Sequence, residues 1–235
     1  MLEDASAKAA ESPRSMDDWS PSFGNRVFRA IVRPVFRLLF HILCRVEIVG
    51  MQNVPRQGGY LVVINHISIF DPPLAVAFWP RAMEIAGAVE VLDRGYQGVL
   101  MRGYGALPVH RGRADRKLLR GMVRFLKQGL PVLIAPEGGR THTAGMRQAW
   151  HGAAYVAGKA EVPMVPVGIT GTESVNEIWK LRQRPKLRMV IGEPFMLAPV
   201  PWSSPARKQA LEANTEHLMR RIAQLMPIEY RGVYG

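Results

Sequence analysis

Apolar residues recur along the chain with two spacings, one typical of strands and one typical of helices. Short apolar runs predict strands at 46–49, 60–64, 84–89, 106–109, 131–135, 164–170 and 187–191. Apolar residues every three or four positions predict helices at 23–44, 72–79, 116–127, 145–159 and 205–226. Ser204 and Pro205 are expected to begin the last helix as its N-cap and its first residue. Because strands alternate with helices, the sequence predicts an α/β layered domain with a largely parallel sheet.

The predicted helix at 23–44 carries a basic stripe beside a broad apolar surface. Basic side chains recur every three or four positions, at Arg26, Arg29, Arg33, Arg37, His41 and Arg45. Pro34 is expected to kink or split the helix, because proline lacks the N–H that a helix interior needs. This pattern is typical of a helix that lies in a membrane interface. The alternative is a helix packed on the protein's own core with a solvated basic edge. The apolar surface is wider than a small domain is expected to cover, which favours the membrane.

Three parts of the chain differ in composition. Residues 1–18 hold five acidic and two basic residues and few apolar ones, which predicts a disordered acidic tail. Residues 19–50 hold the amphipathic membrane-associating helix and a lead-in strand, and residues 51–235 hold the α/β domain. No stretch approaches the ~20 uninterrupted apolar residues of a transmembrane helix. The acidic N-terminus does not resemble a secretory signal.

The overall composition is that of a folded protein, but the charge is unusual. The 235 residues are 48% hydrophobic and 21% charged, and the single cysteine, Cys44, excludes an internal disulfide and a Cys-rich zinc site. The net charge of +12 favours an anionic partner, such as a membrane, a phosphate-bearing substrate or nucleic acid. Nucleic acid is the least favoured of these, because no aromatic residues are interleaved with the basic ones and no nucleic-acid motif is present.

The segment YLVVINHISIFDPP, residues 60–73, places polar groups where a buried strand ends. His66 follows the strand, and Asp71 comes five residues later. A carboxylate can hold one ring nitrogen of a histidine, which leaves the other nitrogen to act as a base. Residues five apart do not face each other on one helix, so the chain must turn between them if they pair. The alternative is that Asp71 only caps the helix that starts at Pro72.

Two further segments carry candidate anion-binding groups. In VLIAPEGGRT, residues 132–141, adjacent glycines let a ligand approach the backbone, and Arg140 offers a planar guanidinium suited to phosphate. The alternative is an ordinary turn in which Arg140 and Glu137 pair on the surface. In GYGALPVHRGR, residues 103–113, a short strand leads to Arg111, which is a second phosphate candidate.

A fourth segment, VPMVPVGITG at 162–171, is expected to form a wall of a pocket. In chain order, NHISIFD, GALPVHR, APEGGRT and VPMVPVGITG resemble the four motif blocks of the glycerolipid acyltransferase family. The best-known members of that family are bacterial 1-acyl-glycerol-3-phosphate (lysophosphatidate) acyltransferases. The blocks span about residues 60–171, roughly half of the chain. Each block is weak evidence alone, whereas four in this order, each beside a predicted strand, are specific.

The resemblance implies a fold and a set of site residues. The fold is a mixed, largely parallel sheet flanked by helices, with an N-terminal helical element that associates with the membrane. His66 corresponds to the catalytic base and Asp71 to the carboxylate that orients it. The implied substrate-binding residues, of which the third block holds the acyl acceptor, are Arg111, Glu137, Gly138, Gly139, Arg140, Thr141 and Pro166.

The implied reaction moves a fatty acyl group from acyl-CoA or acyl-carrier protein to a lysophospholipid hydroxyl. The favoured acceptor is 1-acyl-glycerol-3-phosphate, which gives phosphatidic acid in phospholipid biosynthesis. No metal, cofactor or covalent acyl-enzyme is expected. The expected partners are an anionic membrane surface, the acyl donor and the lipid acceptor. The expected location is the cytoplasmic face of the cell membrane, with peripheral or monotopic attachment.

Two departures from the family pattern keep a second acceptor open. Many lysophosphatidate enzymes carry a lysine just before the second block, where this chain has Ala88. The third block usually has a threonine where this chain has Gly139. The alternative is therefore the same acyl transfer to a lipid without a phosphate, such as an amino-acid lipid or a glycolipid.

Overall fold

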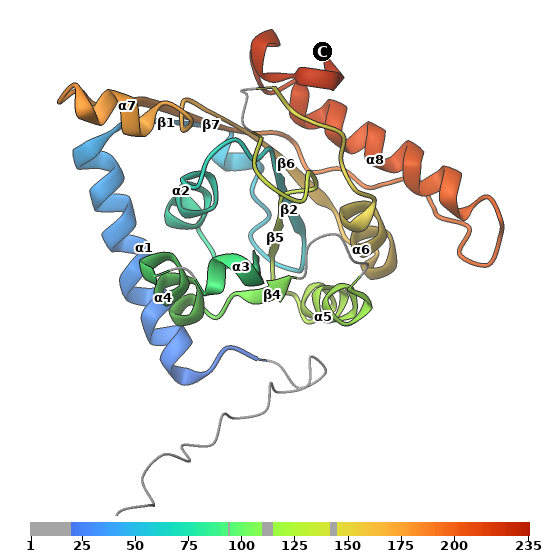
Figure 1. Cartoon of the computed structure of the whole chain (residues 1–235). Coiled ribbons are helices and arrows are strands. Elements are labelled where there is room, and N and C mark those ends of the chain that lie inside the picture. Colours follow the sequence, from blue (N-terminus) through green and yellow to red (C-terminus); the bar gives the residue numbers. More distant parts are fainter. Residues whose placement is uncertain (1–19, 94, 110–114, 142–144) are drawn as a thin grey trace, which may run out of the picture.

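The computed structural model describes residues 20–93, 95–109, 115–141 and 145–235, which form one seven-stranded sheet between two layers of helices (Figure 1). The strand order is β1-β7-β6-β2-β5-β3-β4, and every neighbouring pair is parallel except β6 and β7. The strands are β1 (Arg45–Val49), β2 (Leu61–Ile64), β3 (Glu84–Ala88), β4 (Leu107–Val109), β5 (Val132–Ile134), β6 (Met164–Thr170) and β7 (Lys186–Ile191). This confirms the predicted α/β fold with a largely parallel sheet. The predicted acidic tail at 1–18 lies outside the described residues.

Helices cover both faces of the sheet because its central strand is apolar on both sides. Val62 and Ile64 of β2 belong to one core cluster, and Leu61 and Val63 belong to the other. The first cluster packs under α1 and α2, and the second packs under α5, α6 and α8. The helices are α1 (Phe23–Leu43), α2 (Asp71–Phe78), α3 (Val89–Leu92), α4 (Gly95–Tyr104), α5 (Arg116–Lys127), α6 (Gly152–Ala160), α7 (Val175–Lys180) and α8 (Arg207–Ala223), with short 3₁₀ turns at Met51–Asn53, Ile228–Tyr230 and Gly232–Tyr234.

Two of the predicted helices have wrong boundaries. Helix α6 begins at Gly152 rather than at 145, because the preceding backbone bonds elsewhere: the Met146 N–H donates to Tyr230 O, and the Trp150 N–H donates to Pro136 O. Helix α8 begins at Arg207 and ends at Ala223, so Pro205 is not its first residue. Ser204 is not its N-cap, because its hydroxyl accepts from the Ala206 N–H in a turn before the helix.

Helices α3, α4 and α7 were not predicted from the sequence. Helix α4 contains three glycines, which lower helix propensity. Tertiary packing overrides that preference, since a Cβ on Gly103 would meet the Phe28 ring of α1 at 2.8 Å. Helices α3 and α7 have only four and six residues, which is too short for a helical period of apolar residues to be recognised in the sequence.

Helix α1 runs without a break through Pro34, so it is not split, and the middle of its basic stripe, Arg29, Arg33 and Arg37, bonds to the rest of the protein. Arg29 is buried and forms a bidentate ion pair with Glu84 of β3, with nitrogen–oxygen distances of 2.6 and 2.8 Å. Arg33 donates to the carbonyls of Val76 and Trp79, and Arg37 to that of Ala77. These arginines satisfy carbonyls at the end of α2 that have no helical partner. The expectation that the whole stripe is free to meet a membrane is therefore wrong for these three arginines, whereas Arg26, His41 and Arg45 are exposed.

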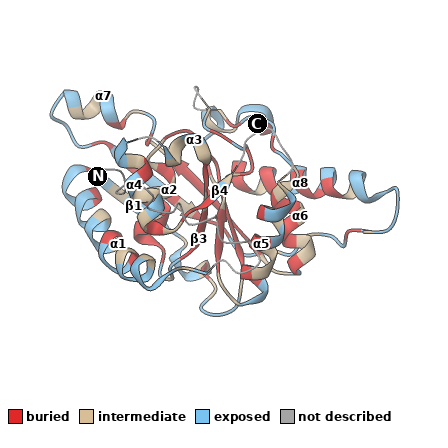
Figure 2. Ribbon diagram, turned by 60° about the horizontal axis from the view of Figure 1, so that its bottom comes forward, coloured by how far each residue is buried: buried red, intermediate tan, exposed pale blue. Residues whose placement is uncertain are grey.

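The outward side of α1 is apolar instead. Its exposed large hydrophobic side chains recur with the helical period and are Phe23, Val27, Ile31, Val35, Leu38, Leu39, Ile42 and Leu43. We call this set the apolar face of α1. Figure 2 shows the sheet buried and the outer side of α1 exposed. Among the described residues, no helix is both long enough and apolar enough to cross a membrane.

Candidate active site

The site forms where three neighbouring parallel strands end. Strand β2 lies between β6 and β5, and all three run in the same direction. The residues that follow these strands therefore meet at one edge of the sheet, which is where α/β folds place ligands. They are His66 after β2, Glu137 after β5 and Thr172 after β6.

His66 and Asp71 form the predicted contact. The Nδ1 atom of His66 lies 2.9 Å from Oδ2 of Asp71, and the imidazole is 15% exposed. Because a carboxylate accepts this bond, Nδ1 carries the proton, and Nε2 is the basic nitrogen. No partner of Nε2 lies among the described residues. His66 therefore presents a base at the edge of the sheet.

The capping alternative for Asp71 is wrong. Helix α2 begins at Asp71 itself, and its N-cap is Phe70. The carboxylate points back toward the preceding loop, where Oδ2 accepts from the N–H groups of Ile67 at 2.8 Å and Ser68 at 2.7 Å. Asp71 is fully buried, so these bonds hold it in one position. The loop turns between His66 and Asp71, as their pairing requires.

Thr172 is a site residue that the sequence analysis missed. It is buried, and its hydroxyl donates to Oδ1 of Asp71. Gly171 makes this possible, since its φ is +85° and a Cβ there would meet Lys186 O at 2.0 Å. The available signal was position alone, because Thr172 directly follows the fourth block. Thr172 is a positioning residue that fixes the carboxylate which in turn orients His66.

Replacing Thr172 by valine is expected to lower turnover about 10–100-fold, because a hydrogen bond to a charged group contributes ~1.5–3 kcal/mol. Valine has nearly the same shape, so the melting temperature reports whether packing also changes. Thr172→Ser restores the hydroxyl and is expected to recover most of the activity. Steady-state kinetics of both variants measure this, and a serine variant as impaired as the valine one contradicts the positioning role.

The alternative in which Glu137 pairs with Arg140 on the surface is wrong. Glu137 is fully buried, its Oε1 accepts from the His66 N–H at 2.9 Å, and its Oε2 accepts from the Arg147 N–H at 3.0 Å. Burial raises the pKa of Glu137 above its ordinary value, and the two N–H bonds from Arg147 and His66 lower it. The carboxylate of Glu137 thus links the backbone of His66 to the backbone of Arg147. Its predicted contact with substrate stays a prediction.

Arg140 is exposed beside this loop. Together with Thr141 and Arg147, it lines a shallow hollow of about 410 Å³ whose other walls are Gly145, Met146, Gly232 and Val233. The Thr141 N–H donates to His66 O at 2.9 Å, so one wall of the hollow is bonded to the backbone of His66. Gly138 turns the chain here with φ +69°, and a Cβ would meet Trp150 at 2.9 Å. Gly139 is buried in the same turn.

The other predicted substrate-binding residues lie elsewhere. Pro166 is buried inside β6 opposite Val63, and its ring packs close to Gly192. Its predicted substrate contact stays a prediction. Arg111 lies outside the described residues. Ala88, which motivated the second acceptor, is buried at the end of β3.

Two potential nucleophiles, Ser68 and Cys44, are buried in the fold. Ser68 is buried, and its hydroxyl accepts from the Phe70 N–H at 3.3 Å. Cys44 is buried at the end of α1, and burial raises the pKa of its thiol, which disfavours a reactive thiolate. Within the described part of the chain, no group of three or more His, Cys, Asp or Glu side chains is arranged to bind a metal ion.

Fold and site together define an α/β protein with a histidine–aspartate pair at the carboxyl edge of a helix-flanked sheet. Residues 45–170, more than half of the chain, match the model of the acyltransferase family. The chain belongs to this family and is an acyltransferase.

Named relatives agree with this assignment. The 1-acyl-sn-glycerol-3-phosphate acyltransferase of Bacillus subtilis is 27% identical over 181 residues, which cover 77% of this chain and 87% of the relative. The human 1-acyl-sn-glycerol-3-phosphate acyltransferase alpha is 29% identical over 196 residues, which cover 80% of this chain and 67% of the relative. The crystal structure of the 1-acyl-sn-glycerophosphate acyltransferase PlsC from Thermotoga maritima superposes with a TM-score of 0.61 at 24% identity, over 86% of this chain and 81% of that chain. At this identity the superposition supports the fold alone.

Proposed function

We propose that this protein transfers a fatty acyl group from acyl-CoA or acyl-carrier protein to the free hydroxyl of 1-acyl-glycerol-3-phosphate, which yields phosphatidic acid. The observation that carries the proposal is the His66–Asp71 contact, with the basic nitrogen of His66 left for substrate. Two supporting facts are the family match and the names of the relatives. Neither names the acyl donor of this chain.

The proposed mechanism uses His66 as a general base. Nε2 takes the proton from the acceptor hydroxyl as its oxygen attacks the thioester carbonyl carbon. Asp71 keeps the Nδ1–H in place and stabilises the imidazolium that forms. When the tetrahedral intermediate collapses, the C–S bond breaks and His66 returns the proton to the departing thiolate. No covalent acyl-enzyme is required, which agrees with the burial of Ser68 and Cys44.

A thiol-release assay tests the function directly. Free thiol from a long-chain acyl-CoA or acyl-carrier protein is measured against a panel of acceptors that differ in headgroup. The expected result is release that depends on 1-acyl-glycerol-3-phosphate. Release that depends only on an amino-acid lipid or a glycolipid favours the second candidate, which rests on Ala88 and Gly139. Absence of release with every acceptor contradicts the proposal.

Replacing Arg140 by alanine is expected to raise the KM for the phosphate-bearing acceptor about tenfold or more, because Arg140 lines the hollow beside His66 and a guanidinium–phosphate bond contributes ~1.5–3 kcal/mol. The KM for the acyl donor is expected to change little. Arg207→Ala is the matched control, because Arg207 is exposed at the start of α8. An unchanged acceptor KM in Arg140→Ala contradicts phosphate binding at this position.

We also propose that the protein works at an anionic membrane surface, attached peripherally or monotopically to the cytoplasmic face of the cell membrane. The support is the apolar face of α1, which is exposed along the whole helix. A helix with one side apolar and the other bound to a folded domain is suited to lie in the interface between headgroups and hydrocarbon. The acceptor is itself a membrane lipid, so this placement brings the enzyme to its substrate.

A further inference from the structure

A second exposed segment beside α1 is strongly basic. Residues 180–188 read KLRQRPKLR and run from the end of α7 into β7; we call them the basic loop. The five basic residues of this loop are all exposed: Lys180, Arg182, Arg184, Lys186 and Arg188. Leu181, which lies among them, is 68% exposed. The segment therefore shows an apolar side chain inside a cluster of cations.

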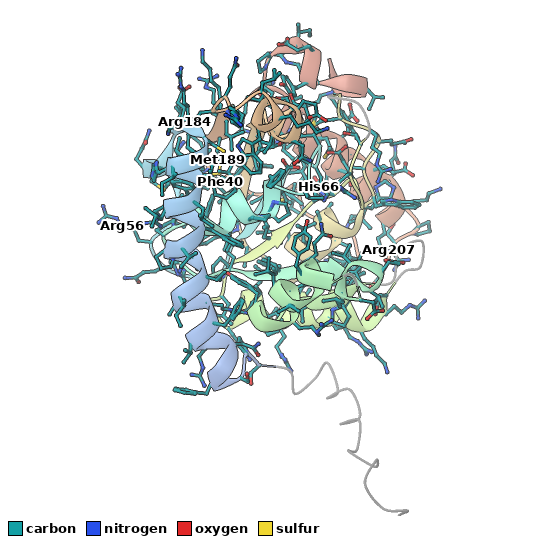
Figure 3. The ribbon with its side chains drawn as sticks, turned by 60° about the vertical axis from the view of Figure 1, so that its left-hand side comes forward. Phe40, Arg56, His66, Arg184, Met189 and Arg207 are labelled. Atoms are coloured by element: carbon teal, nitrogen blue, oxygen red, sulfur yellow. The ribbon has the colours of Figure 1, made fainter. Side chains whose placement is uncertain are left out.

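The basic loop adjoins the end of the apolar face of α1. Arg184 donates to the carbonyl of His41 and, at 2.6 Å, to that of Cys44. Both surfaces line one shallow hollow of about 300 Å³, whose residues are Ile42, Leu43, Trp179, Arg182, Gln183 and Arg184. Figure 3 shows Arg184 at the upper end of α1, with His66 near the middle of the molecule. The cations of the loop and the apolar side chains of α1 thus form one continuous surface.

Three of the five cations are available for an external anion. Arg188 pairs with Glu47 at 3.3 Å, and Arg184 is bound to backbone carbonyls. Among the described residues, no carboxylate lies within 4.0 Å of Lys180, Arg182 or Lys186. Arg182 also has a φ of 55°, a backbone conformation that favours glycine. The backbone conformation therefore gives no reason for an arginine at this position, which leaves its charged side chain as the reason.

We propose that the basic loop binds the anionic headgroups of a phospholipid bilayer while Leu181 and the apolar face of α1 enter the hydrocarbon edge. This inference rests on the membrane association proposed above, and it moves the electrostatic contact from the α1 arginines to residues 180–188. Lysine and arginine near an anionic surface attract it, and adjacent apolar side chains add burial.

The same segment links the membrane contact to the catalytic loop. The Trp179 Nε1–H donates to Leu43 O of α1 at 3.1 Å. The Trp179 ring also packs edge-on against Phe70, with ring centroids 5.5 Å apart. Phe70 directly precedes Asp71, so the residues that meet the lipid headgroups are one side chain away from the loop that carries the catalytic pair.

Vesicle binding of the full chain tests the basic loop. The variant combines Lys180→Gln, Arg182→Gly and Lys186→Gln; the glycine suits the local backbone, so the fold is expected to remain intact. Each cation near an anionic surface contributes about fivefold, so affinity for phosphatidylglycerol-containing vesicles is expected to fall about 100-fold. The matched control removes three cations from α8: Arg207→Gln, Lys208→Gln and Arg220→Gln. Arg207 lies on the side of the molecule away from α1 (Figure 3), and the control is expected to bind like wild type.

Three outcomes overturn the proposal. The first is wild-type vesicle affinity of the loop variant, and the second is an equal loss in the α8 control, which shows that only net charge matters. The third is that the wild-type protein binds duplex DNA more tightly than it binds the vesicles. A variant with Ile31→Asp and Leu38→Asp tests α1 separately, so α1 can be confirmed while the loop is refuted. Thiol release measured in detergent micelles is expected to be unchanged in the loop variant, which separates failure of this inference from failure of the proposed reaction.

Discussion

Replacing His66 by alanine is expected to lower turnover by about 10²–10⁴-fold, because positioned general-base catalysis contributes a factor of that size. The expectation rests on the contact between Nδ1 and Asp71, which leaves Nε2 as the basic nitrogen at the edge of the sheet. Alanine removes that nitrogen but keeps the backbone N–H that donates to Glu137, so the brace between β2 and β5 remains. The fold is therefore expected to survive the substitution.

Turnover is measured by thiol release, and the fold is checked by circular dichroism and the melting temperature. His217→Ala is the matched control, since His217 is exposed on α8 and packs edge-on against Phe195. The control is expected to keep its activity. A folded His66→Ala protein with near-wild-type turnover would falsify the general-base role.

Asp71→Asn is expected to lower turnover by about 10³–10⁴-fold, by analogy with other histidine–aspartate pairs whose carboxylate is replaced by an amide. The carboxylate accepts from His66, Ile67, Ser68 and Thr172 while fully buried. An amide has one acceptor oxygen and no negative charge, so it cannot keep all four donors in charge-assisted bonds to an acceptor oxygen. Stability is expected to fall by about 1–3 kcal/mol as a result.

Asp115→Asn provides the contrast for this variant. Asp115 is the N-cap of α5 and accepts from the N–H groups of Lys117 and Leu118. Asparagine and aspartate serve about equally well as N-caps, so this variant is expected to keep the capping of α5 and its activity. Full activity in Asp71→Asn would mean that the charge at position 71 is not needed. The measurements are kcat, KM and the melting temperature of both variants.

The sequence was informative wherever a local pattern had one structural solution. Helix α5 and strand β6 have the predicted bounds, because an unbroken apolar period fixes each of them. The pairing of His66 with Asp71 was also predictable, since both lie in one seven-residue block. The start of α6 was not predictable, because the N–H groups of residues 146 and 150 bond to carbonyls 84 and 14 residues away.

Helix α1 shows the limit of periodicity most clearly. The period identified the helix and its basic stripe, but it does not say which side faces the protein. The usual expectation that charges face water fails here because Arg29 has Glu84 as a buried partner, and Arg33 and Arg37 have free carbonyls at the end of α2. Those partners lie 40 or more residues away along the chain.

By itself, the sequence determined the α/β class, the acyltransferase family and the histidine–aspartate pair, because each depends on local order along the chain. Only the tertiary structure decided that Glu137 braces the loop of His66, that Thr172 holds Asp71, and that the apolar side of α1 faces outward. The physical reason is the same in all three cases. A buried polar group must find a hydrogen-bond partner, and here the fold supplies it from a strand or helix distant in sequence.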